Sequence, residues 1–241
     1  MGYIRRNIVR PPTRPISVSV DSDAVKTESQ PSVSATTIET TWPVEYTAAI
    51  EPAEPAEPIT SQLPPTESAY QQRNLWTDNV WRTRNFYISY MNNFPDLQSA
   101  KSFLDQNLRD LGNSIKPYYG NGAGDRLRDI LESRLMAFVS VLEYVKAAPP
   151  ALDLATDTTV GQRLLVWKDR NDAVFDVLAS LNPAAWNKTE IRNVIDNGRD
   201  FWWNQIQARH KNEWVRDLTF LDYSFDNAAR TAGVVLRGIP S

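Results

Sequence analysis

The sequence predicts an all-α protein, an antiparallel bundle of about six helices that follows a long extended N-terminal arm. Three observations lead to this prediction. Apolar residues recur at helical spacing through residues 70–241, proline or glycine interrupts that spacing at intervals typical of helix length, and no stretch of this part requires a strand. Short connections between successive helices favour antiparallel neighbours.

The first 69 residues differ in composition from the rest of the chain. Residues 1–14 form a basic tip with four arginines and no acid, whereas residues 15–69 hold nine carboxylates against one lysine. The first 70 residues also contain ten of the sixteen prolines and one of the eight tryptophans. Because such a segment buries too little apolar surface to fold alone, we divide the chain into an arm, 1–69, and a helical bundle domain, 70–241.

The arm has two interpretations, a solvated linker or a segment that becomes ordered on a partner protein. Apolar and polar residues alternate around Val18, which is typical of a strand added to another sheet. Trp42 and Tyr46 place aromatic anchors in an otherwise polar tract. With Arg5 and Arg6 at the basic tip, these residues are the predicted partner contacts of the arm.

The first two helices are expected over residues 69–93 and 97–115. The apolar face of the first comprises Trp76, Val80, Thr83, Tyr87, Tyr90 and Phe94, widened by Trp81 and Ile88. Pro95 ends the first helix because it cannot donate a backbone hydrogen bond, and Asp96 or Ser99 is expected to cap the second.

Residues 111–120 are expected to connect the second helix to the third, which we place at residues 125–147. Pro117 disfavours helical angles at the residue before it, so the second helix should end there. The glycines that follow give a permissive backbone, and Asp125 is the expected cap of the third helix.

Three further helices follow, over residues 160–181, 187–209 and 211–237. Pro149 and Pro150 precede the fourth helix, and Pro183 separates the fourth helix from the fifth. Asn187 or Thr189 is expected to cap the fifth helix. Since Trp202 and Trp203 are neighbours on one helix, they cannot face the same way. We expect Trp203 at an interface, where tryptophan is enriched.

The connector allows a ligand-binding alternative. Glycine amides, Lys116, Tyr118 and Tyr119 would converge on an anion, with Arg84 as a further ligand-binding residue. The favoured interpretation is a tight turn with its tyrosines packed inside, because a capping Asp125 would already occupy the positive end of the helix dipole. Arg84 is expected to pair with a carboxylate across the bundle, such as Asp172; alternatively it lines a polar pocket with Asn79 and Thr83.

Composition excludes several classes of chemistry. The chain has no cysteine and one histidine, His210, so neither a thiolate metal site, a histidine-built metal centre nor a Ser-His-Asp arrangement is expected. The net charge of −3 argues against a general nucleic-acid binder. No apolar run reaches the roughly 18 residues that span a bilayer. We predict no catalytic residue, no metal and no cofactor.

Several strings resemble an uncharacterised family of helical proteins known mainly from bacterial genomes. They include Leu75-Trp76, Thr83-Arg84, Pro95-Asp96-Leu97, the connector Ile115-Lys116-Pro117-Tyr118-Tyr119-Gly120, Asn171-Asp172-Ala173, Leu181-Asn182-Pro183 and Gly238-Ile239. The resemblance covers about residues 70–240 and implies a helical fold but no activity. It also implies that relatives carry histidines at the positions of Asn79, Arg134 and Gly198.

A bundle that has lost these histidines and gained a long arm suggests a domain reused as a structural part. By analogy we predict a non-enzymatic structural protein, a minor capsid or cement component of a large DNA virus, whose arm ties neighbouring subunits. The expected partners are capsid subunits within a larger assembly, and the expected location is the virion, with the cytoplasm as the alternative. A small-molecule or anion-binding bundle remains the second hypothesis.

Overall fold

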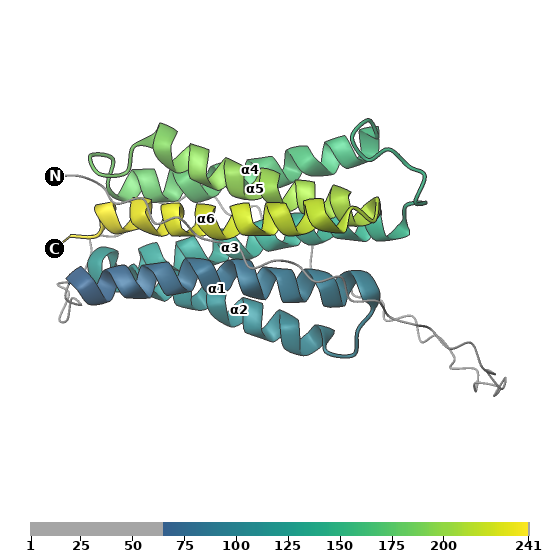
Figure 1. Ribbon diagram of the computed structural model, residues 1–241. Helices are drawn as coiled ribbons and strands as arrows, with labels where there is room; N and C mark the ends of the chain where they lie inside the picture. Colours follow the sequence, from purple (N-terminus) through teal and green to yellow (C-terminus); the bar gives the residue numbers. More distant parts are fainter. Residues whose placement is uncertain (1–64, 241) are drawn as a thin grey trace, which may run out of the picture. The chain divides into compact units, whose positions relative to one another are not determined.

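The computed structural model describes residues 65–240, which form six α-helices joined by short connections (Figure 1). The helices are α1 (Pro65–Asn92), α2 (Leu97–Asn113), α3 (Lys116–Ala147), α4 (Thr158–Leu181), α5 (Lys188–His210) and α6 (Trp214–Gly238). No strand occurs in this range, so the predicted all-α fold is confirmed for it. Residues 1–64 of the predicted arm lie outside the described residues.

The six helices close into a ring of neighbours. Each helix packs against the next in the sequence, and α6 packs back against α1 (Figure 1). The first turn of α1 is joined to α3 by a hydrogen bond between Ser68 and Tyr118, while the adjacent Tyr119 donates to the carbonyl of Gly238 at the end of α6. The start of α1 therefore lies beside the end of α6, and these two helices run antiparallel around a shared interior.

An aromatic cluster fills the middle of that interior. The Phe138 ring lies 5.1 Å from Trp167, 6.0 Å from Trp202 and 6.4 Å from Tyr87, measured between ring centroids. The four rings come from α3, α4, α5 and α1 and are all buried. Each buried side chain of this size stabilises the fold by about 1.5–3 kcal/mol, so the cluster holds four helices together.

The predicted apolar face of α1 is wrong at two positions. Trp76, Val80 and Tyr87 are buried as expected, but Trp81 and Phe94 are 55% and 47% exposed. Trp81 directly follows Val80, so its side chain projects about 100° further around the helix, beyond the arc that faces the ring. Phe94 lies beyond the end of α1, between it and α2.

The connector also differs from the prediction. The third helix begins at Lys116 instead of residue 125, because Pro117 occupies its first turn, where a missing N–H costs no hydrogen bond. Gly120 interrupts the helix with a φ of 81°, a conformation that glycine adopts without strain. Asp125 consequently lies inside α3 and caps nothing.

The N-caps of the other helices are a mixture of confirmed and incorrect predictions. Asn187 caps α5, its side chain accepting from the backbone N–H of Thr189 at 2.9 Å and of Glu190 at 3.4 Å. Asp157, for which no cap was predicted, caps α4 in the same way, through the N–H of Val160 at 2.8 Å. Asp96 immediately precedes α2, but its carboxylate makes no capping bond.

Two glycines allow α2 and α3 to approach closely at the connector. A Cβ atom on Gly112 would lie 2.5 Å from the carbonyl oxygen of Gly124, and one on Gly124 would lie 2.6 Å from the carbonyl oxygen of Gly112. Both separations are well below van der Waals contact and involve backbone, so the helices would have to move apart. By contrast, a Cβ on Gly122 meets nothing within 4 Å.

These three glycines give a matched stability test. We expect Gly124→Ala to lower the free energy of unfolding by about 1–3 kcal/mol, since the added methyl overpacks a helix contact. Gly122→Ala should be neutral or stabilising by up to about 1 kcal/mol, because alanine favours helix over glycine. Urea denaturation measures both; equal effects of the two substitutions would contradict the close approach of α2 and α3.

Candidate functional site

Arg84, one of the predicted ligand-binding residues, forms a buried ion pair with Asp217. Its two terminal nitrogens donate to the two carboxylate oxygens at 2.6 Å and 2.5 Å, joining α1 to α6. This two-bond arrangement matches the planar geometry of both groups. The prediction that Arg84 pairs with a carboxylate across the bundle is confirmed, but the partner is Asp217 and not Asp172, which lies 2.6 Å from Lys168 on its own helix.

Two residues of α5 complete the surroundings of this pair. Gln205 accepts a hydrogen bond from Arg84 at 3.0 Å, and Arg209 donates to Asp217 at 2.8 Å. Asp217 thus faces two guanidinium groups, and its carboxylate is almost entirely buried. The cluster links α1, α5 and α6. The terminal guanidinium nitrogens of Arg84, which a ligand would need, are already hydrogen-bonded within it.

Lys116 is engaged in a similar way inside α3. Its ammonium lies 2.7 Å from a carboxylate oxygen of Asp125, on the far side of the Gly120 kink. The hydrogen bond from Lys116 holds the pKa of Asp125 below its ordinary value of 3.8. The ion pair therefore braces the kink, and Asp125 serves as the partner of Lys116 where a helix cap was predicted.

The two connector tyrosines pack into the bundle, as the favoured interpretation predicted. The Tyr118 hydroxyl is 2.8 Å from the Ser68 hydroxyl, and the Tyr118 side chain is buried. Tyr119 stacks at a tilt against Trp186 with 5.2 Å between centroids, and burial raises the pKa of its hydroxyl. Both tyrosines thereby tie the connector to the ends of α1 and α6.

The predicted partner contacts are only partly covered by the structure. Trp202 is buried, whereas its neighbour Trp203 is half-buried and packs against the edge of the core. Arg5, Arg6, Val18, Trp42 and Tyr46 lie outside the described residues. A role for any of these residues in partner binding stays a prediction.

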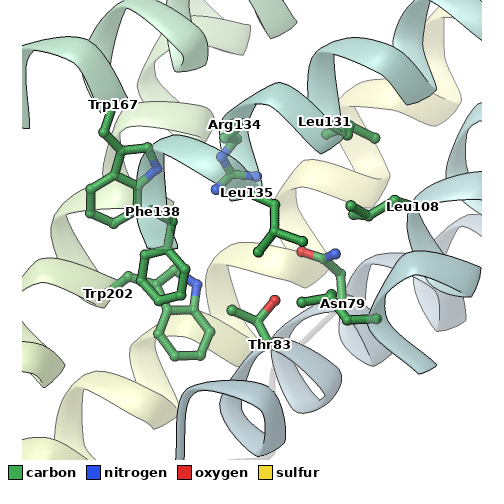
Figure 2. A pocket seen from close by; sticks show the side chains of 10 residues that line it. Asn79, Thr83, Leu108, Leu131, Arg134, Leu135, Phe138, Trp167 and Trp202 are labelled. Carbon is green, nitrogen blue, oxygen red and sulfur yellow. The ribbon is translucent and has the colours of Figure 1, made fainter. Parts of the chain in front are cut away.

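A pocket lies inside the ring of helices, and two of the residues that line it carry unpaired polar atoms. Its lining comes from five helices: Asn79, Thr83, Leu104, Leu108, Leu131, Arg134, Leu135, Phe138, Trp167 and Trp202 (Figure 2). Asn79 and Thr83 thus share a pocket, as the alternative prediction had it, but Arg84 is not part of it. The cavity volume, measured at the centres of water-sized spheres, is about 30 Å³, which holds two or three water molecules.

Two residues of the pocket lining carry buried hydrogen-bond donors without acceptors among the described residues. Neither Arg134 Nε nor the indole Nε1 of Trp167 has a hydrogen-bond partner, although both atoms are buried. Figure 2 shows the Trp167 nitrogen turned toward the Arg134 guanidinium, with the Thr83 hydroxyl and the Trp202 nitrogen directed at the open centre. No carboxylate is among the lining residues.

Arg134 is a cation without a counter-ion within residues 65–240. Its Nε is inaccessible to solvent, while the residue as a whole is partly exposed. Burial, together with the positive charge of the nearby Arg199, lowers the pKa of Arg134 to about 10. The group is therefore still protonated at neutral pH, in a site with no acid to balance it.

The sequence contains one signal for this pocket that the predictions did not use. Arg134 follows Leu131 by three residues and precedes Phe138 by four, so it lies on the apolar face of its own helix. A charged residue on a buried helical face requires a partner. The resemblance marked Asn79, Arg134 and Gly198 as positions of change; the first two line the pocket, and Gly198 does not.

Comparison with known proteins gives no identification: no family model, curated protein or solved structure matches the chain. The resemblance suggested by the connector therefore stays a prediction. Across residues 65–240, no group of three or more His, Cys, Asp or Glu side chains is arranged to hold a metal ion. The helices in that same range are too short or too polar to cross a bilayer.

The buried ion pair gives a stability prediction. We expect Asp217→Asn to lower the free energy of unfolding by about 3–5 kcal/mol, because it leaves Arg84 buried without a counter-ion. Removing both charges with Arg84→Met and Asp217→Leu should recover much of that loss. Asp78→Asn, which breaks a largely exposed pair with Arg82, is the control and should cost at most about 1 kcal/mol. Equal losses for the buried and exposed pairs, measured by urea denaturation, would refute this assignment.

The Lys116–Asp125 pair gives a pH prediction. Because the folded-state pKa of Asp125 is lowered, the pair stabilises the fold above pH 3.8, and this contribution disappears as the pH falls through the lowered pKa. Lys116→Met should therefore raise the pKa of Asp125 toward 3.8, as followed by carboxyl ¹³C NMR titration. An unchanged Asp125 pKa would mean that Lys116 is not its main partner.

Proposed function

We propose that the chain is a non-enzymatic structural protein that docks on other proteins through the outer surface of α1 and α6. The observation that supports this proposal is a group of large apolar side chains exposed there. On the first turns of α6, Trp214 is 52%, Val215 81% and Leu218 55% exposed, and Trp81 on the adjacent α1 is 55% exposed. We call these four residues the α1–α6 surface.

The composition of this surface favours a protein partner. Single exposed apolar residues are ordinary, but two tryptophans with a leucine and a valine on adjacent helices are typical of a contact surface. Tryptophan contributes much of the binding energy at protein interfaces because it buries a large rigid area. The α1–α6 surface is thus a better candidate for partner contact than Trp203, which packs against the core.

The finer form of the proposal assigns the chain to a minor capsid or cement protein of a large DNA virus. The support is the sequence of the first 69 residues, with a basic tip, an acidic proline-rich segment and isolated aromatic anchors. Segments of this composition bind by wrapping along a partner surface. The partners would be capsid subunits, with the arm tying neighbouring copies and the virion as the location; a cytoplasmic assembly is the alternative.

The second hypothesis, a ligand site at the connector, is less favoured. Arg84, Lys116, Tyr118 and Tyr119 all make internal contacts, so a ligand would have to displace an ion pair or a packed ring. A ligand function finds better support elsewhere in the bundle, at the pocket beside Arg134.

The test of the proposed function is recovery of the full chain in purified native particles. We expect the chain to sediment with particles at a constant ratio, and its residues 1–64 to resist protease there but not after release. The double substitution Trp214→Gln and Leu218→Gln should lower the recovered fraction about tenfold or more. Leu165→Gln, a 62% exposed leucine on α4, is the matched control and should leave recovery unchanged.

Either of two results would contradict the proposed function. One is recovery of the unsubstituted chain only in the particle-free fraction. The other is an equal loss of recovery for the α1–α6 surface variant and the Leu165 control, which would mean that the α1–α6 surface is not the contact.

A further inference from the structure

The unpaired donors inside the ring point to a second, separate property of the bundle. We propose that the pocket beside Arg134 binds a small monocarboxylate, such as acetate or propionate, whose carboxylate accepts hydrogen bonds from Arg134 and Trp167. This site is independent of the α1–α6 surface and of the connector, and it shares no residue with either.

Within residues 65–240, Arg134 lacks the negatively charged partner that a cation in such a site requires. A buried charge is stable when it is paired, and the buried Arg84 has a carboxylate partner at 2.5 Å, whereas Arg134 is only partly buried. Arg134 has none among the described residues, and its neighbour Arg199 is a second cation whose own carboxylate partners, Asp196 and Asp200, lie on its own helix. An external anion at the pocket would supply the missing charge.

Hydrogen-bonding chemistry leads to the same ligand. The indole N–H of Trp167 can only donate, and so can the guanidinium N–H groups of Arg134. Two buried donors without partners, on residues that line one pocket, leave a cost that only an acceptor removes. Water accepts two hydrogen bonds but brings two donors of its own, whereas a carboxylate brings acceptors only.

Size and wall chemistry restrict the ligand to a short acid. Room for two or three waters corresponds to a carboxylate with one or two carbons attached. Most of the wall is apolar, formed by Leu104, Leu108, Leu131, Leu135 and Phe138, and it suits a methyl or ethyl group. Phosphate fits less well, because its additional oxygens would face hydrocarbon and a single arginine would have to balance up to two charges.

The experiment uses the full chain and measures thermal unfolding and tryptophan fluorescence against sodium acetate and sodium propionate. Sodium chloride at equal ionic strength, acetamide as a neutral isostere and sodium phosphate are the comparisons. We expect saturable stabilisation by the two carboxylates, with an apparent Kd of about 0.1–10 mM. The affinity is weak because ligands with so few non-hydrogen atoms make few contacts. The comparison compounds should give no saturable change.

Substitutions assign the response to the pocket. Arg134→Met should abolish the carboxylate response or weaken it at least about tenfold, while leaving the melting temperature without ligand unchanged or raised, because an unpaired buried charge is removed. Arg126→Met, on the same helix but outside the pocket lining, should respond as the unsubstituted chain does. Trp167→Phe, which removes one donor and keeps all charges, should weaken the response by about three- to tenfold and covers the case in which Arg134→Met fails to fold.

Three results would overturn the proposal. The first is no saturable response to acetate or propionate. The second is an equal response in the full chain and its Arg134→Met variant, or in the full chain and its Trp167→Phe variant if Arg134→Met does not fold. The third is a response to phosphate or chloride that matches or exceeds the response to the carboxylates.

Discussion

The buried ion pair between Arg84 and Asp217 is the strongest electrostatic constraint where the ring of helices closes. It joins the first helix to the last, and Gln205 and Arg209 of α5 extend it to a third helix. Removal of one partner alone would leave an uncompensated buried charge between the first and the last helix. The same electrostatic rule, that a buried charge requires a partner, distinguishes Arg84 from Arg134. Arg84 therefore has a structural role, and Arg134 is left with an unmet requirement.

The positions of most helices could be predicted from the sequence, because they depend on the local spacing of apolar residues. The expected boundaries of α1, α4, α5 and α6 lie within a few residues of the observed ones. The start of α3 was missed because Pro117 and Gly120 resemble a helix terminus in sequence, whereas one begins a helix and the other kinks it. Which carboxylate pairs with Arg84 was not predictable, because Asp172 and Asp217 are both aspartates on predicted helices. Only the ring topology brings Asp217 to α1. The pocket depends on residues from five helices, an arrangement that local spacing does not contain.

The two proposals concern opposite sides of the same ring. The α1–α6 surface faces outward and is apolar, as suits contact with a protein. The pocket faces inward and combines a cation and an indole donor with hydrocarbon walls, as suits a short acid. A bound carboxylate would neutralise Arg134 and satisfy Trp167, so it would strengthen the packing of α3 against α4 without altering the outer face.

The unpaired donors of Arg134 and Trp167 require an external acceptor under this proposal, and ¹H–¹⁵N NMR of the indole groups tests that requirement directly. The chain has eight tryptophans, of which Trp167 and Trp202 line the pocket. On titration with acetate, we expect the Trp167 indole N–H signal to shift downfield and to saturate. The Trp202 signal should respond more weakly, and the other indole signals should stay in place. Trp→Phe substitutions provide the assignments. Absence of any indole shift, or a uniform shift of all of them that chloride reproduces, would contradict the proposal.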